Sequence, residues 1–130
     1  MEKIEVVAVM PVKSTTIYND WLSSKGHTEM TGGAAQIAKE VGSKHTAWDG
    51  YISGEIIELS ENQLIQMSWR TSEFDEGAEY SQLQITFEDG SDGCKITINQ
   101  WNMPDGDGEK YKQGWQEYYF EPMLAYYSEE

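Results

Sequence analysis

The chain has 130 residues, which suits one domain, residues 1–130, with a sizeable buried core. Its 23 acidic residues outweigh nine basic ones and give a formal net charge of −14, which repels phosphate backbones and anionic membrane surfaces. We therefore expect no nucleic acid and no membrane as a partner. The lone Cys94 rules out an internal disulfide, and the charged start at Glu2 and Lys3 disfavours a signal peptide, so we expect a cytoplasmic protein. We also expect a monomer.

The N-terminal segment predicts a strand followed by a short helix. Residues 3–10 are β-branched and partly alternating, which favours a strand that ends at Pro11. Ser14 is the expected N-cap of the helix, and Gly26 its expected end. The apolar positions at helical spacing are Ile17, Tyr18, Trp21 and Leu22.

The middle of the chain predicts a loop and then a run of strands. Residues 27–33 are polar and contain glycine, which favours a loop or a single turn, and short strands are expected around 35–40 and 45–48. Asp49-Gly50 is a hairpin-type turn signal. Three longer strands are expected at 51–59, 64–71 and 79–88.

Two of these strands alternate between apolar and polar side chains, which predicts one dry face for the sheet. The first alternating set is Ile65, Met67 and Trp69 against Gln66, Ser68 and Arg70. The second is Ser81, Leu83, Ile85 and Phe87 against Gln82, Gln84 and Thr86.

A last strand and a long helix are expected at the C-terminal end. Residues 89–93 form a predicted turn, 95–101 a strand and 102–108 a loop. From Glu109 apolar residues follow helical spacing, and Pro122 inside this helix predicts a kink because it lacks an N–H group. The order of elements indicates an α+β fold, in which a curved antiparallel sheet covers one long helix.

Five stretches of the sequence together resemble a known family. They are residues 27–34, 47–54, 68–70, 80–83 and 111–122. In this order and spacing they resemble the C-terminal domain of the activators of the heat-shock-protein-90 ATPase, within the START-like or SRPBCC superfamily. The resemblance implies a helix-grip fold with short helices after the first strand, and often a cavity between the sheet and the C-terminal helix.

Aromatic residues are more numerous than core closure requires, with five Trp and eight Tyr, and several could line such a cavity. The alternative for each of them is ordinary core packing. The candidate ligand-binding residues are Met30, Trp48, Tyr51, Met67, Trp69, Tyr80, Trp101, Trp115, Tyr118 and Tyr119.

Other chemically suggestive residues favour structural roles. The lone Arg70 could receive an anionic ligand, but its polar-face position favours pairing with Glu55, Glu58 or Glu73. His27 and His45 match no zinc pattern, and residues 105–109 fail the EF-hand register. We therefore predict no metal, no cofactor and no catalytic residue.

Three functions remain open at this point. The first is a non-catalytic domain that holds a small apolar or aromatic ligand in a cavity. The second is an interaction module for a heat-shock-protein-90-type chaperone, steered by the acidic surface. The third is a cavity enzyme of the cyclase or hydrolase type, which a buried carboxylate with a raised pKa beside the cavity would favour.

Overall fold

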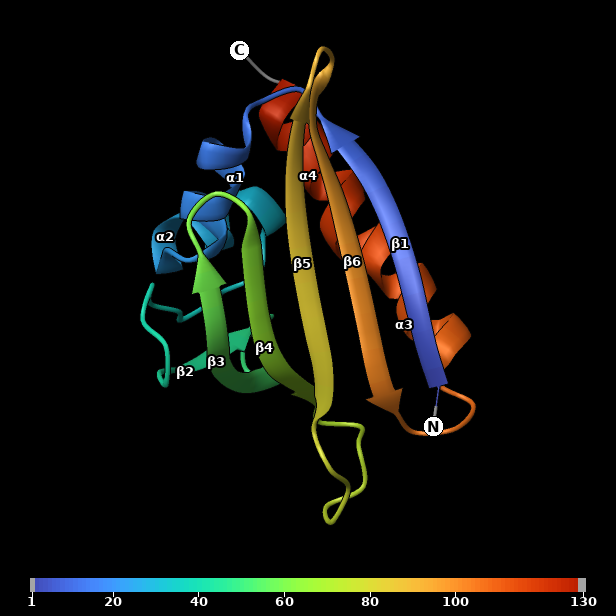
Figure 1. Cartoon of the computed structure of the whole chain (residues 1–130). Coiled ribbons are helices and arrows are strands. Elements are labelled where there is room, and N and C mark those ends of the chain that lie inside the picture. The colour runs from blue at the N-terminus through green and yellow to red at the C-terminus, as the bar shows by residue number, and fades with distance from the viewer. Residues whose placement is uncertain (1, 129–130) are drawn as a thin grey trace.

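A six-stranded antiparallel sheet and a long C-terminal helix dominate the structure, a computed structural model that describes residues 2–128 (Figure 1). The strand order is β1-β6-β5-β4-β3-β2, so β1 joins the sheet through a long-range pairing with β6, while the other pairings join consecutive strands. The bounds are Glu2–Met10 (β1), Lys44–Ala47 (β2), Ile52–Ser60 (β3), Leu64–Thr71 (β4), Ser81–Gly90 (β5) and Gly93–Met103 (β6). The predicted α+β, helix-grip architecture is confirmed.

The inner face of the sheet is dry, as the alternation predicted. Ile65, Met67 and Trp69 of β4 are all buried, whereas the intervening polar residues are only partly covered. On β5, Ser81 and the apolar residues at every second position after it are also buried. Because side chains of a strand alternate between its two faces, the buried set points toward the helices.

The first helix, α1 (Ser14–Trp21), begins at a long-range contact. Lys13 occupies the N-cap position rather than Ser14, and its side chain makes no capping bond. Instead, the carboxylate of Asp89 accepts from the Ser14 N–H at 2.7 Å and from the Ser14 hydroxyl at 2.8 Å. A residue of the β5–β6 hairpin thus satisfies a helix N-terminus that is 75 positions away in the sequence.

A second helix, α2 (Ser24–Thr31), occupies most of residues 27–33, where a loop or a single turn was expected, so that prediction is wrong. The Ser23 hydroxyl accepts from the N–H of Gly26 at 3.1 Å and caps the helix, which ends at Gly32 with a φ of 88°. Gly26 therefore lies inside α2 and does not end the preceding helix.

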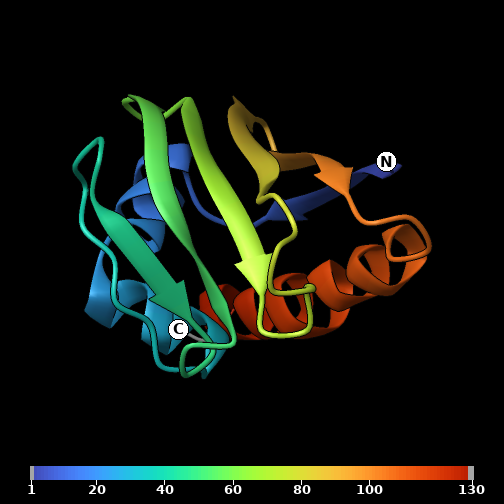
Figure 2. The ribbon, with the colours of Figure 1, turned by 90° about the horizontal axis from the view of Figure 1, so that it is seen from below.

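The C-terminal helix runs from residue 108 to 128 and lies under the concave face of the sheet (Figure 2). Its segments are α3 (Gly108–Trp115), one π turn (Gln116–Phe120) and α4 (Glu121–Ser128). A kink was predicted at Pro122, and just before this residue the helix contains the π turn, in which the Glu121 N–H donates to the carbonyl of Gln116. The wider turn relieves the clash that a proline ring makes inside an α-helix. Among the described residues, no helix is both long and apolar enough to cross a membrane.

Smaller differences from the predicted elements concern short strands and loop bounds. Residues 35–40 form no strand and contribute only one bridge, between Gln36 and Thr46. The turn at Asp49-Gly50 is confirmed, since β2 and β3 are joined there by residues with positive φ. Strand β6 continues to Met103, which shortens the loop before the C-terminal helix.

Candidate functional site

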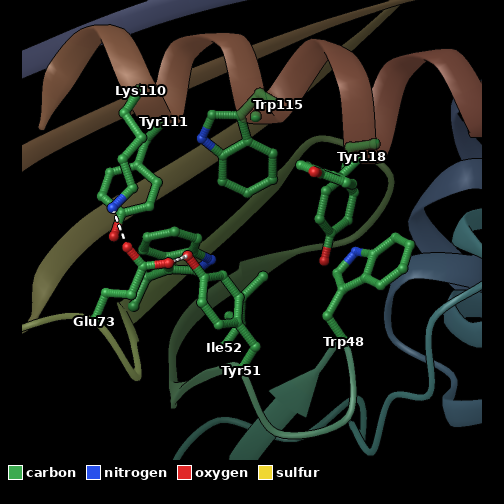
Figure 3. A pocket seen from close by; sticks show the side chains of 11 residues that line it. Trp48, Tyr51, Ile52, Glu73, Lys110, Tyr111, Trp115 and Tyr118 are labelled. Carbon is green, nitrogen blue, oxygen red and sulfur yellow. Dashed lines mark hydrogen bonds and ion pairs between the residues drawn. The ribbon is translucent and has the colours of Figure 1, made fainter.

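A cleft of about 480 Å³ lies between the inner face of β3 and β4 and the C-terminal helix (Figure 3). Three of the residues that surround the cleft are exposed to solvent: Glu73, Lys110 and Tyr118. The described residues that line it are Trp48, Tyr51, Ile52, Trp69, Glu73, Lys110, Tyr111, Gly114, Trp115, Tyr118 and Tyr119. Seven of these eleven are aromatic, so most of the wall is apolar or weakly polar.

One end of the cleft holds a charged cluster. The Tyr51 hydroxyl donates to Glu73 at 2.6 Å, and the Lys110 ammonium donates to the other oxygen of the same carboxylate (Figure 3). The bonds from Lys110 and from Tyr51 hold the pKa of Glu73 below its ordinary value. Glu73 is thus ionised at neutral pH and connects the β4–β5 loop to α3.

The floor of the cleft is a cluster of tilted aromatic rings backed by a chain of hydrogen bonds. The Trp115 ring lies 5.6 Å from that of Trp69 and 4.8 Å from that of Tyr119, centroid to centroid. The Trp115 indole N–H donates to Gln100 at 2.9 Å, and the Gln100 amide donates to the Ser81 hydroxyl at 3.0 Å. Ser81 in turn donates to the Trp69 backbone carbonyl at 2.6 Å, so the network runs from the Trp115 indole to the main chain of Trp69.

The other end of the cleft is formed by Trp48 and Tyr118, whose rings meet edge to face at 5.7 Å (Figure 3). Trp48 belongs to the β2–β3 turn and has a φ of 50°, a left-handed conformation that is rare for a bulky residue. Gly33 lies against its ring, where a Cβ atom would come within 2.4 Å of the indole. The Trp48 indole nitrogen is buried and has no hydrogen-bond partner among the described residues.

The sequence-predicted site residues fall into three groups. Six lie in the wall of the cleft: Trp48, Tyr51, Trp69, Trp115, Tyr118 and Tyr119. Met30 and Met67 are buried elsewhere in the core and do not line the cleft. Tyr80 and Trp101 are 42% and 36% exposed on the other side of the sheet, so their expected place in the cavity is wrong. Both are strand neighbours of the inward-facing Ser81 and Gln100, and successive side chains point to opposite faces.

Other residues of the site, in the cleft wall or behind it, were not among the candidates. Tyr111 could have been found from its helical spacing to Trp115 and Tyr118, which places the three on one helix face. Gln100 could have been noticed as a polar residue in register with the buried Ile96 and Ile98. Glu73 and Lys110 gave no signal, because charged residues are common everywhere in this sequence.

Arg70 and the two histidines have structural roles. Arg70 donates to the carbonyls of Ala78, Phe74 and Asp75, not to the expected carboxylates, because the β4–β5 loop folds back over it. His27 is buried between the Trp21 carbonyl, 2.9 Å from Nδ1, and the Tyr119 hydroxyl, 2.8 Å from Nε2. His45 donates through Nε2 to the Ser68 carbonyl at 3.0 Å.

A curved antiparallel sheet that grips a long C-terminal helix over an aromatic cleft defines a START-like domain of the helix-grip type. Residues 13–127 match the family model described as activator of Hsp90 ATPase homolog 1-like protein. The chain belongs to this family.

Curated relatives support the same assignment. The human activator of 90 kDa heat shock protein ATPase homolog 1 is 32% identical over 87 residues, which make up 67% of this chain and 25% of that protein. The corresponding mouse protein is 31% identical over the same length. The chain thus covers about a quarter of the length of these relatives.

Among solved structures, an HSP90 activator from Plasmodium falciparum has the same fold, with a TM-score of 0.84 and 21% identity, over 96% of this chain and 95% of that one. The Aha1 dimer from Colwellia psychrerythraea gives a TM-score of 0.81 at 13% identity, over 98% and 97% of the two chains. Both likenesses concern the fold alone.

Proposed function

We propose that this chain is a non-catalytic binding domain that holds a small, mostly apolar ring compound in the cleft under the C-terminal helix. The aromatic side chains are not packed solid against one another but leave about 480 Å³ between them. A largely apolar, concave space of this size is typical of sites for small molecules. Affinity would come from burial of the ligand against the rings.

The position of Gly114 in the cleft wall is the main observation that supports this proposal. It lies within α3 and lines the cleft, although glycine inside a helix costs about 0.5–1 kcal/mol relative to alanine. A Cβ atom at this position would have its nearest contact, Tyr118 Cδ2, at an ordinary 3.9 Å. Packing therefore does not require the glycine, and its effect is to keep this part of the cleft empty.

Filling the cleft tests the proposal. Gly114→Leu places a branched side chain in the space, so we expect binding of 2-ethylnaphthalene, measured by calorimetry, to weaken at least about tenfold. Helical propensity favours leucine over glycine, so the variant should unfold at no lower denaturant concentration than the wild type. Gln113→Leu places the same side chain at the preceding, exposed position of the same helix and is the matched control.

The outcome that would overturn the proposal is that the wild-type chain binds no ring compound and carries no co-purifying small molecule in native mass spectrometry. Equal affinity in the wild type and Gly114→Leu would show that binding occurs elsewhere.

A cavity enzyme is the less favoured reading. Glu73 is the carboxylate among the described lining residues, and its pKa is lowered by Lys110 and Tyr51 rather than raised by burial. An ionised carboxylate with two donors already bound is a poor general acid or base at neutral pH.

A second candidate function is contact with a 90 kDa heat shock protein, which the names of the curated relatives favour. The charge of −14 would steer the chain toward a basic surface, so association should weaken as salt rises. A pull-down with a purified chaperone of this class, at about 30 mM and about 300 mM salt, tests this. Absence of any complex at the lower salt concentration would reject the candidate.

A further inference from the structure

The polar groups of the cleft wall differ in whether a ligand can reach them. Three are already bonded within the protein: the Tyr111 hydroxyl to Thr71, the Trp115 N–H to Gln100 and the Tyr119 hydroxyl to His27. Glu73 and Lys110 also line the cleft, but their side chains are 52% and 45% exposed. These two charged groups are therefore the ones that a ligand in the cleft meets.

The charged end of the cleft has the chemistry of a cation site. Figure 3 shows Glu73, Tyr51, Tyr111 and Lys110 together at this end. The Lys110 ammonium donates to the Glu73 carboxylate and lies over the Tyr111 ring, 5.0 Å from its centroid. A carboxylate beside aromatic rings is an arrangement that binds ammonium groups. One of the protein's own ammonium groups thus already occupies this site.

The Lys110 ammonium can leave the site at little cost. An exposed ion pair of this kind contributes little to stability, because both charges are largely solvated. The pKa of Lys110 is raised first by its bond to Glu73 and also by the nearby charge of Asp107, which lies three positions earlier in the chain. A released Lys110 side chain therefore still has a carboxylate in its neighbourhood. Glu73 stays in place, since the Tyr51 hydroxyl also holds it at 2.6 Å.

The surrounding charges favour a cation over an anion as the incoming group. An anionic group that bound Lys110 would have to displace Glu73, which Tyr51 also holds. It would also approach a protein of net charge −14. A ligand ammonium is attracted by the same net charge and exchanges only with another ammonium.

We propose that the ligand of the cleft is a flat ring compound with an ammonium group, which replaces the Lys110 ammonium on the Glu73 carboxylate. This inference rests on the proposed function and specifies the chemistry of its ligand. The aromatic rings of the floor bind the apolar part of the ligand, and Glu73 selects its positive charge.

Three probes of similar size test the proposal with the full chain: 2-(aminomethyl)naphthalene, 2-ethylnaphthalene and 2-naphthoate. The first two have the same heavy-atom shape and differ in charge. A hydrogen bond between charged groups adds about a factor of ten in affinity, so the aminomethyl compound should bind about five- to tenfold more tightly than the ethyl compound in calorimetry. The naphthoate should bind no better than the ethyl compound.

Two variants at the half-exposed ion pair locate the preference for the aminomethyl over the ethyl compound. Glu73→Gln keeps the length of the side chain but removes its charge, and should reduce the preference to less than about twofold. Lys110→Gln removes the competing ammonium and should raise the preference about two- to fivefold. The matched control is Lys112→Gln, which changes the net charge equally at an exposed position of α3 outside the described cleft wall and should leave the preference unchanged.

Failure of this inference is distinct from failure of the proposed function. Equal affinity of the wild type for the aminomethyl and ethyl compounds, or tighter binding of the naphthoate, would overturn the ammonium class and leave the cleft as a site for ring compounds. A reduced preference in Lys110→Gln, or an equal rise in Lys112→Gln, would overturn the exchange at Glu73. Binding of none of the three probes would overturn both proposals.

Discussion

At the scale of single residues, His27 joins the first half of the chain to the C-terminal helix. The Trp21 carbonyl can only accept, so Nδ1 of His27 carries the hydrogen and Nε2 accepts from the Tyr119 hydroxyl. Burial lowers the pKa of His27 to about 4. Tyr119 lines the cleft, and burial raises its pKa, so this pair is neutral over the physiological range.

His27 predicts a loss of stability in acid. Because its folded pKa of about 4 lies below the unfolded value of 6.5, the unfolded chain binds the proton first. Stability is therefore complete above about pH 6.5 and falls as pH drops toward 4, by about 3 kcal/mol for this group. Urea unfolding at a series of pH values measures it.

The matched comparison is His27→Gln, which removes the titration. Its unfolding free energy should fall less steeply between pH 6.5 and 4, whereas His45, whose pKa burial also lowers, acts equally in both proteins. Identical slopes for the two proteins would contradict the assignment.

At the scale of elements, two features of the helices followed from contacts and not from local pattern. Gly26 was expected to end a helix because glycine is a common stop signal, but it lies inside α2 at the point where α1 passes closest. The sequence likewise located a steric clash at Pro122, but only the structure shows that a π turn lies before it.

The close approach at Gly26 can be tested directly. A Cβ atom there would lie 2.7 Å from the Cα of Asp20 and 2.9 Å from its carbonyl oxygen, so Gly26→Ala must push α1 and α2 apart. We expect a loss of about 1–3 kcal/mol in the free energy of unfolding, measured by chemical denaturation. Gly77→Ala, where nothing lies within 4 Å, is the control and should be neutral or slightly stabilising. Equal effects of the two substitutions would refute the packing argument.

At the scale of the whole molecule, the cleft is assembled from three distant parts of the chain. Trp48 comes from the β2–β3 turn, Glu73 from the β4–β5 loop and Tyr118 from the π turn of the C-terminal helix. The long C-terminal helix packs against the other elements that carry the cleft wall. A substitution at Gly114 therefore changes the cleft from the helix side, and a substitution at Trp48 changes it from the opposite side.

The sequence by itself determined the class of fold, the dry face of the sheet and six of the aromatic residues in the cleft. These depend on local rules: alternation along a strand, spacing along a helix and the residues that form turns. Only the tertiary structure decided that Tyr80 and Trp101 face outward, that Arg70 binds loop carbonyls and that the Trp48 N–H has no partner. The sequence specifies which side chains are present, but their hydrogen-bond partners and their burial depend on which distant segments pack against them.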